Sequence, residues 1–165
     1  EHIRGYISED YYRQCCKKYV PKLNDIYMIK SGATTGKVSI VDTDIIFTIW
    51  SPLAVFRANT NKILYKFLYY ALNSEYYQMQ VQTNWTYGTQ QNIGMRTLEK
   101  LKIVLAPIVE QMEIVNYLDK KCSEIDEILN SKMKQKEQME QYKKSVIYEY
   151  VTGKKRVEGA EELYG

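Results

Sequence analysis

The spacing of apolar residues predicts one long helix near the end of this chain. Between Pro107 and Gly153 there is no further proline or glycine, and apolar residues recur at intervals of three and four, which marks one face of a helix. Proline fits the first turn of a helix, and glycine fits the position just after its end. We therefore expect a helix over residues 107–152, roughly 60 Å long, which is more than one small domain can cover.

The apolar stripe of this helix is the face through which it would pair with another helix. Its members are Leu118, Cys122, Ile125, Ile128, Leu129, Met139, Tyr142, Val146 and Tyr150. Residues 130–138 are rich in lysine and poor in apolar side chains, so they interrupt the stripe. Two interpretations stay open: the helix folds partly onto its own domain, or it leaves the domain and pairs with a helix of this or another chain. The predicted length favours the second.

The residues before this helix mix strand and helix patterns, which predicts an α+β globular domain over residues 1–106. Short apolar runs bounded by turn residues predict strands at 25–29, 38–41, 45–50, 53–57 and 102–105. Residues 83–95 are polar and aromatic and are expected to form a loop, and residues 98–101 a short turn. A tail that is first basic and then acidic, residues 153–165, follows the long helix.

Two further helices are predicted inside the domain. Residues 62–82 show helical spacing, and Asn73 and Ser74 can divide this stretch in two. Near the start of the chain, Ser8 suits the N-cap of a short helix that runs through Tyr19, because a serine hydroxyl accepts hydrogen bonds from the first free amides of a helix.

Composition sets bounds on the class of protein. The 165 residues suffice for one domain and the helix, and a hydrophobic content of 45% supports a packed core. The net charge is only +3, so a surface for nucleic acid would have to arise from local arrangement. Sixteen tyrosines suit a contact surface, although many of these rings are expected in the core.

Cysteine usage and hydropathy indicate a cytoplasmic protein. Cys15, Cys16 and Cys122 are odd in number and lack metal-ligand spacing, so we expect reduced thiols. No apolar run is long enough to cross a membrane, and no signal peptide is visible. The single histidine, His2, lies at the chain start, where a catalytic role is not expected.

Motifs for independent catalysis are absent from the sequence. The stretch from Gly32 to Lys37 superficially resembles a phosphate-binding P-loop, but only three residues separate Gly32 from Gly36, and Val38 follows the lysine where serine or threonine is required. A tight turn between two strands explains both glycines. With no G-x-S-x-G, H-E-x-x-H, paired-cysteine or G-x-G-x-x-G motif, we expect no catalytic residue, no metal site and no cofactor in this chain.

Two stretches carry side chains suited to DNA. The turn at residues 30–37 offers ammonium and hydroxyl groups, which commonly bind phosphate oxygens. The segment 83–95 offers rings that stack or pack, amides that pair with adenine N6 and N7, and residue 96 adds a guanidinium for phosphate or guanine. The candidates are Lys30, Thr34, Thr35, Lys37, Trp85, Tyr87, Gln90, Gln91, Asn92 and Arg96, with Arg57 and Trp50 as weaker ones. The alternatives are a solvated Asn/Gln-rich loop and, for Trp50, a place in the core.

The order of three stretches resembles the specificity subunit of type I restriction-modification systems. Residues 25–37 match the strand-turn pattern D-I-x-x-x-x-x-G-A-x-x-G-K of that family. Residues 105–114 match L-P-P-x-x-E-Q-x-x-I, the opening of its long helix, except that Ala106 replaces the first proline. Between them, Gln-Asn-Ile at 91–93 precedes Leu-Glu-Lys-Leu-Lys-Ile at 98–103.

This resemblance implies a target recognition domain that reads one half of a split sequence in double-stranded DNA. It also implies that the long helix packs antiparallel against a second helix and sets the distance between the two halves. Partner subunits would do the chemistry: a methyltransferase subunit using S-adenosylmethionine, and a restriction subunit using ATP and Mg²⁺. One domain and one helix make half of such a subunit, so the resemblance predicts a homodimer, or a second half-subunit, joined through the helix.

Two rival interpretations keep the same elements but change the role. Under the first, the chain is a coiled-coil scaffold or interaction protein without affinity for DNA. Under the second, it is the recognition tail of a fused methyltransferase-nuclease. Binding to duplex DNA across a salt series separates the first rival from DNA recognition, because phosphate contacts make affinity fall steeply with salt.

Overall fold

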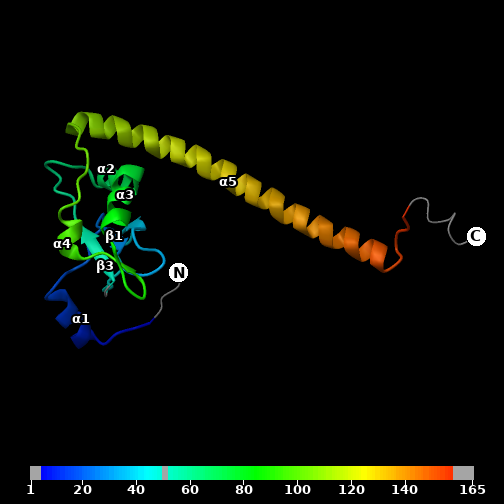
Figure 1. Cartoon of the computed structure of the whole chain (residues 1–165), viewed down its shortest axis with the longest axis horizontal. Helices are drawn as coiled ribbons and strands as arrows, with labels where there is room; N and C mark the ends of the chain where they lie inside the picture. Colours follow the sequence, from blue (N-terminus) through cyan, green and yellow to red (C-terminus); the bar gives the residue numbers. More distant parts are fainter. Residues whose placement is uncertain (1–4, 50–51, 158–165) are drawn as a thin grey trace, which may run out of the picture. The chain divides into compact units, whose positions relative to one another are not determined.

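The computed structural model describes residues 5–49 and 52–157 and confirms the α+β class. The chain divides into two units, residues 1–116 and 117–165. The first unit contains a small sheet with short helices, and the long helix α5 begins in the first unit and continues in the second (Figure 1). In the described ranges, no helix combines the length and the apolar character needed to cross a membrane.

The sheet has three antiparallel strands in the order β2-β1-β3. They are β1 (Ile26–Ile29), β2 (Val38–Ile40) and β3 (Leu53–Phe56), which confirms three of the predicted strands. The predicted strand at 45–50 is wrong over residues 45–49, and Trp50 lies outside the described residues. The reason is topological: β2 and β3 lie on opposite edges of β1, so the connection between them has to cross the sheet.

Helices α2 (Tyr65–Asn73) and α3 (Glu75–Asn84) cover the sheet, as Figure 1 shows. The predicted break is confirmed at Ser74, whose hydroxyl accepts a hydrogen bond from the amide of Tyr77 and caps α3. Alternate residues of β1 face these helices, because side chains of a strand point to opposite faces in turn. The buried core consists of Ile26, Met28, Ala54, Ile63, Phe67, Leu68, Leu72, Tyr77, Val81, Ile93, Leu98 and Val115.

Helix α1 (Glu9–Cys16) begins as predicted, since the hydroxyl of Ser8 accepts from the amide of Tyr11. The helix ends at Cys16, three residues before the predicted end at Tyr19. The phenol of Tyr19 is hydrogen-bonded to Asp25, which draws the chain away from the helix axis and toward the sheet.

The segment predicted as a loop contains regular structure. It forms a hairpin of β4 (Thr86–Tyr87) and β5 (Gln91–Asn92), and α4 (Met95–Leu98) follows. The predicted strand at 102–105 is wrong, because no strand pairs with this segment in the described residues. The side chain of Gln80 bonds to this backbone in place of a neighbouring strand: its amide group accepts from Lys102 N at 3.0 Å and donates to Lys102 O at 2.8 Å.

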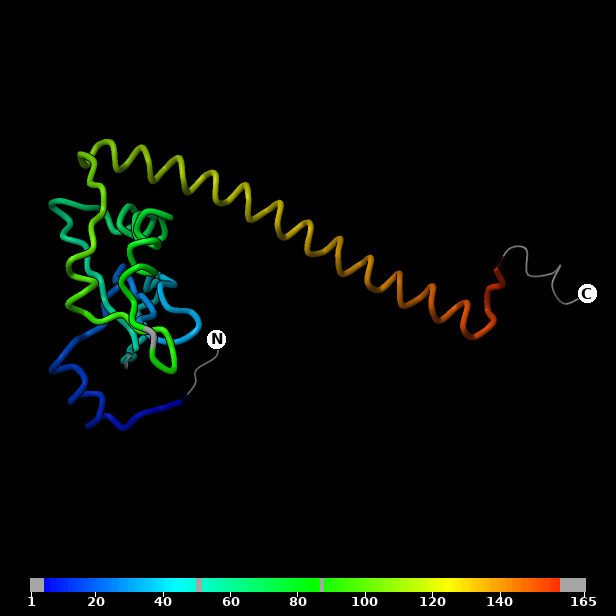
Figure 2. The backbone as a smooth tube through the Cα atoms, in the orientation of Figure 1, coloured from blue at the N-terminus to red at the C-terminus, as the bar shows by residue number. Residues whose placement is uncertain are grey.

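Helix α5 (Ile108–Val151) has 44 residues and confirms the predicted helix to within one residue at each end. Figure 2 traces it as one uninterrupted coil. Gly153 follows with a positive φ of 73°, a conformation that glycine adopts at little cost. Within the first unit, Gln111 and Val115 of α5 are buried.

Candidate nucleic-acid interface

The two stretches predicted to contact DNA lie side by side, although about sixty residues separate them in the sequence. The amide of Gly32 donates to the carbonyl of Gln91 at 3.0 Å, and the amide of Ile93 donates to the carbonyl of Lys30 at 2.9 Å. Ser31 and Asn92 form an antiparallel bridge between these bonds. We call the turn at 30–37 and the hairpin at 86–92 the paired loops.

The turn is held in one conformation by backbone bonds and by α3. The amide of Gly36 donates to Ile29 O at 2.8 Å, and the amide of Ile29 donates to Lys37 O at 3.0 Å. The side-chain amide of Gln78 donates to Gly36 O at 2.9 Å. Gly36 has φ +93°, and a Cβ at this position would lie 2.6 Å from Gln78 Oε1. The positive φ therefore favours glycine here, and an added Cβ would push aside the end of the Gln78 side chain.

Most of the predicted contact side chains on and beside the paired loops are open to solvent. The exposed ones are Thr34, Lys37, Gln90, Asn92 and Arg96, and the partly buried ones are Lys30, Thr35 and Gln91. Thr35 has a structural task, since its hydroxyl donates to Gly32 O at 2.7 Å and lies 3.5 Å from Gln91 O. The surface thus combines cationic, hydroxyl and amide groups, which are the groups that bind phosphates and base edges.

Two of the other candidates have contacts inside the domain, and the side chain of a third is not described. Trp85 is partly buried and packs against the hydrophobic core. The backbone of Tyr87 forms part of β4, but its side chain lies outside what the structure describes. The guanidinium of Arg57 is bound within the domain, to Asp25 and to the carbonyl of Val20.

A buried carboxylate at the start of β1 organises the polar groups around Arg57. Asp25 is 1% exposed and binds Arg57 Nε and Nη2 at 2.6 and 2.7 Å, a bidentate pairing. It also accepts from the phenol of Tyr19 and from the amide of Lys22, the latter at 2.8 Å. Tyr19 donates or accepts a further bond with the phenol of Tyr27 at 3.1 Å.

The protonation of this cluster follows from its contacts. Burial raises the pKa of Asp25, but the hydrogen bonds from Arg57, Tyr19 and the Lys22 amide outweigh burial and hold it below its ordinary value. Burial, together with the bond to Asp25, raises the pKa of the Tyr19 phenol. The hydrogen bond to Asp25 raises the pKa of Arg57. The cluster is therefore an ion pair that joins the start of β1 to the end of β3, and the Arg57 side chain, which is 45% exposed, is held in it.

Gln111, in the first turns of α5, is a structural position that was not predicted from the sequence. Its side chain is fully buried and joins three backbone groups. The amide oxygen accepts from Leu64 N at 2.9 Å, and the amide nitrogen donates to Lys62 O at 3.0 Å and to Ala106 O at 2.7 Å. Leu64 is the N-cap of α2 and has no side-chain cap of its own, so Gln111 ties the start of α5 to the start of α2. The position of this glutamine in the Glu-Gln pair of the helix-opening motif could have indicated this role.

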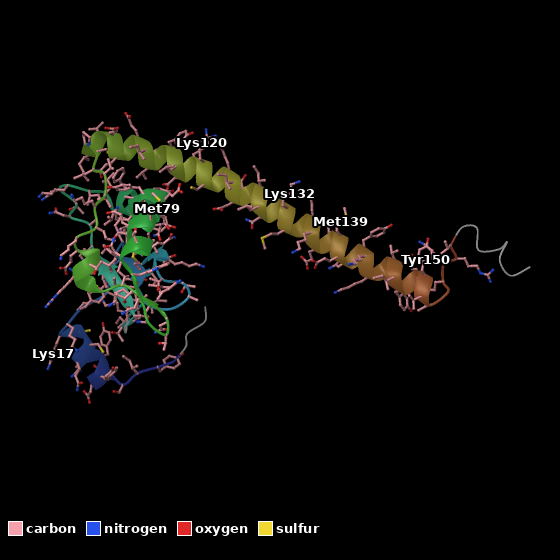
Figure 3. The ribbon with its side chains drawn as sticks, in the orientation of Figure 1. Lys17, Met79, Lys120, Lys132, Met139 and Tyr150 are labelled. Atoms are coloured by element: carbon pink, nitrogen blue, oxygen red, sulfur yellow. The ribbon has the colours of Figure 1, made fainter. Side chains whose placement is uncertain are left out.

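The predicted helix-pairing residues all lie on α5, and most are solvent-exposed. Those with more than 40% exposure are Ile125, Ile128, Leu129, Met139, Tyr142 and Tyr150, and Cys122 is exposed as well. Leu118 and Val146 are half-buried. Figure 3 labels Lys132, Met139 and Tyr150 along this helix. In the described ranges, no group of three or more histidine, cysteine, aspartate or glutamate side chains is arranged to hold a metal ion.

Comparison with known proteins identifies relatives over most of the chain. Residues 5–141 match the family described as "Type I restriction modification DNA specificity domain". The chain is 29% identical over 157 residues to the type I restriction enzyme MjaVIII specificity subunit of Methanocaldococcus jannaschii, a match covering 93% of this chain and 36% of the relative. It is 31% identical over 130 residues to the putative type I restriction enzyme MjaX specificity subunit of the same organism, covering 79% of this chain and 29% of the relative.

A solved structure supports the same assignment. The crystal structure of the type I restriction-modification system S subunit from M. genitalium aligns with a TM-score of 0.51 and 27% identity, over 62% of this chain and 27% of that one. The chain thus spans about a third of the length of the curated relatives it matches. The resemblance predicted from the strand-turn and helix-opening motifs is confirmed: the chain belongs to the family of type I restriction-modification DNA specificity domains.

Proposed function

We propose that this chain recognises one half of a bipartite target in double-stranded DNA and catalyses no reaction itself. The observation that carries this proposal is the pairing of the two predicted contact stretches by the bonds from Gly32 to Gln91 and from Ile93 to Lys30. These bonds gather the exposed polar side chains of the paired loops on one rigid scaffold. Rigid placement matters because base readout depends on hydrogen bonds made at fixed distances and angles.

The side chains divide by the part of DNA they suit. Lys37 and Thr34, exposed on the turn, would hold phosphates and set the orientation of the domain on the duplex. Gln90 and Asn92, exposed on the hairpin, would read base edges in the major groove, where an amide can pair with adenine through two bonds. Arg96, also exposed, would bind a phosphate or a guanine.

The proposal extends to the partners of the family. A methyltransferase subunit would bring S-adenosylmethionine, and a restriction subunit would bring ATP and Mg²⁺ and cleave DNA. Helix α5 would pair with a second helix, either from another copy of this chain or from a second half-subunit, and so set the spacing between two recognised half-sites. The exposed apolar stripe of α5 supports this pairing, because packing against a second helix would remove these apolar side chains from water and stabilise the helix.

The test is binding of the chain to a pool of random duplexes across a salt series, followed by selection of the tightest sequences. Specific binding is expected to weaken steeply with salt. Lys37→Ala should reduce the slope of log affinity against log salt by about 1, equally for all sequences. Gln90→Ala should instead cost about 1–3 kcal/mol on the selected sequence and relax preference at one base pair. Lys120→Ala, an exposed lysine on α5 that Figure 3 labels, is the matched control and should change neither.

Two outcomes would contradict the proposal. If no duplex binds at about 50 mM salt, with or without added methyltransferase subunit, the chain is not a DNA reader. A helix-mediated scaffold would then explain α5 better. If binding occurs but Lys37→Ala and Lys120→Ala lose affinity equally, DNA is held elsewhere than on the paired loops.

A further inference from the structure

Gln78, on helix α3, joins the turn at residues 30–37 to the helices that cover the sheet. Its side chain is partly buried, and its amide nitrogen donates to Gly36 O at 2.9 Å and to Leu72 O at 2.7 Å. Leu72 lies in the last turn of α2, where the carbonyl groups of a helix lack partners within the helix. The turn, α2 and α3 therefore meet at this one side chain.

The orientation of the Gln78 amide follows from its two acceptors. Both are carbonyl oxygens, which accept hydrogen bonds and donate none, so only the NH2 group of the amide satisfies them. Its two hydrogens suffice for the two bonds. The amide oxygen lies next to Gly36, where an added Cβ would be 2.6 Å from it. The absence of a side chain at Gly36 thus leaves the space that the amide occupies.

The bond to Gly36 O holds the peptide group that leads into Lys37. Gly36 O and Lys37 N belong to the same planar unit, so fixing the oxygen also fixes the direction of the amide. That amide donates to Thr34 O at 3.1 Å, inside the turn. Lys37 and Thr34 carry the exposed side chains that we assigned to phosphates. Gln78 therefore constrains the backbone beneath two contact residues without being one of them.

We propose that Gln78 is a positioning residue for DNA binding, which holds the turn in the conformation that presents Lys37 and Thr34 to phosphates. This inference rests on the proposed function and adds a residue from outside the two contact stretches. The hairpin anchors the first part of the turn through Gly32, and Gln78 anchors the last part through Gly36. The second anchor matters because a glycine backbone has more conformational freedom than that of any other residue.

Gln80 provides a matched control on the same helix. It is also a partly buried glutamine whose side-chain amide bonds to the backbone of a distant segment, accepting from Lys102 N and donating to Lys102 O. Those bonds hold the segment that precedes α5 and not the turn. Gln78→Met and Gln80→Met each replace an amide by an apolar side chain of similar size, and only Gln78→Met should disturb the turn.

Hydrogen exchange of the full chain tests the positioning without DNA. The amides of Thr35, Gly36 and Lys37 are all hydrogen-bonded in the turn. In Gln78→Met they should exchange at least about tenfold faster than in the wild type, because the turn opens more often once its anchor on α3 is lost. In Gln80→Met their exchange should not change. Wild-type exchange in Gln78→Met would overturn the inference.

A double-mutant cycle with Lys37→Ala tests the role in DNA binding. Loss of one phosphate contact lowers affinity about tenfold at about 0.1 M salt and reduces the salt slope by about 1. Gln78→Met should do both, whereas Gln80→Met should do neither. Adding Lys37→Ala to Gln78→Met should then lower affinity by less than about twofold, because the contact is already lost. A tenfold effect of Lys37→Ala in both backgrounds would overturn the inference, since Gln78 would then not act through Lys37.

Gly36→Ala provides a second route to the same contact if Gln78→Met does not fold. Its Cβ would displace the Gln78 amide from the other side, so the same changes in exchange and the same cycle with Lys37→Ala are expected. The two proposals fail in different ways. If the wild type binds no duplex, the proposed function is wrong and the DNA role of Gln78 falls with it. If the wild type binds and Gln78→Met keeps wild-type affinity, the recognition role stands and the positioning role is wrong.

Discussion

Replacing Gln111 by leucine should destabilise the recognition domain. The side chain is fully buried and makes three hydrogen bonds, to Leu64 N, Lys62 O and Ala106 O. Leucine has nearly the same size but no polar atom. All three backbone groups would then lose their partner in a place that the Gln111 side chain now occupies.

The magnitude follows from these contacts. A buried polar group left without a partner costs about 1–3 kcal/mol, and leucine returns part of this through its apolar surface. We expect Gln111→Leu to lower the free energy of unfolding by about 2–4 kcal/mol. For a unit of 116 residues this corresponds to a fall in Tm of roughly 10–20 °C.

Urea unfolding followed by tryptophan fluorescence measures this loss, because Trp85 packs against the core of the first unit. The slope with denaturant should stay unchanged, which shows that the same surface unfolds. Gln141→Leu, an exposed glutamine on the same helix, is the control and should change stability by less than about 0.5 kcal/mol. A loss below about 1 kcal/mol for Gln111→Leu would refute the clamp, since the three backbone groups would then have found other partners.

Three further substitutions probe the frame of the domain by the same unfolding assay. Asp25→Asn should lower the free energy of unfolding by about 2–3 kcal/mol at pH 7. Because the folded pKa of Asp25 is lowered, this stability difference is present above the unfolded pKa near 4 and disappears as pH falls through the folded pKa. A stability difference that is equal at every pH would contradict the assignment. Gly36→Ala should cost about 1 kcal/mol more than Gly32→Ala, since both have positive φ but only at Gly36 would the new Cβ displace the Gln78 amide and weaken its hydrogen bonds to Gly36 O and Leu72 O; equal costs would count against that contact. Tyr77→Phe should leave stability unchanged or raise it by about 0.5–1 kcal/mol, because this buried phenol, whose pKa burial raises to about 12, has no hydrogen bond among the described residues.

Local rules carried the prediction of the helices. The absence of glycine and proline after Pro107, with apolar residues at helical spacing, placed α5 to within a residue at each end. Ser8 was recognisable because capping is an interaction between a side chain and amides two or three residues away, and Asn73 and Ser74 were recognisable as a break between two helices. In each case, all the groups that decide the structure lie within one or two turns of the same helix.

The two predicted strands that are absent depend on distant partners. Residues 45–49 have strand-like composition, but β1 already has a neighbour on each side, and this segment has to connect the two edges. Lys102 meets the side chain of Gln80, 22 residues earlier, and its backbone groups are satisfied there without a strand. Strand propensity cannot reveal either fact, because it describes one segment and not its competitors.

The candidate surface was predicted only in part, because contacts between distant segments cannot be seen in the sequence. Grouping the exposed lysine, threonine and amide residues by chemistry identified side chains that the structure brings together. It did not show that Arg57 binds Asp25, because 32 residues separate them and the pairing follows from the neighbouring strands β1 and β3. The role of Gln111 was hidden too, since a glutamine near a helix start usually faces water, and only the packing of α5 on α2 buries it.

The motif residues that identify the family stabilise the fold, and this bears on how recognition of DNA can change. Asp25 holds the ion pair, Gly36 permits the turn, and Gln111 clamps α5, so each is tied to the fold by burial, backbone angle or hydrogen bonds. Gln90 differs: it is exposed, and its side chain makes no hydrogen bond to any described residue. We therefore expect Gln90→Ala to stay within about 0.5 kcal/mol of wild-type stability while altering the selected DNA sequence. Loss of stability comparable to that of Gln111→Leu would show instead that the reading residues also support the fold, and that target specificity cannot change independently of it.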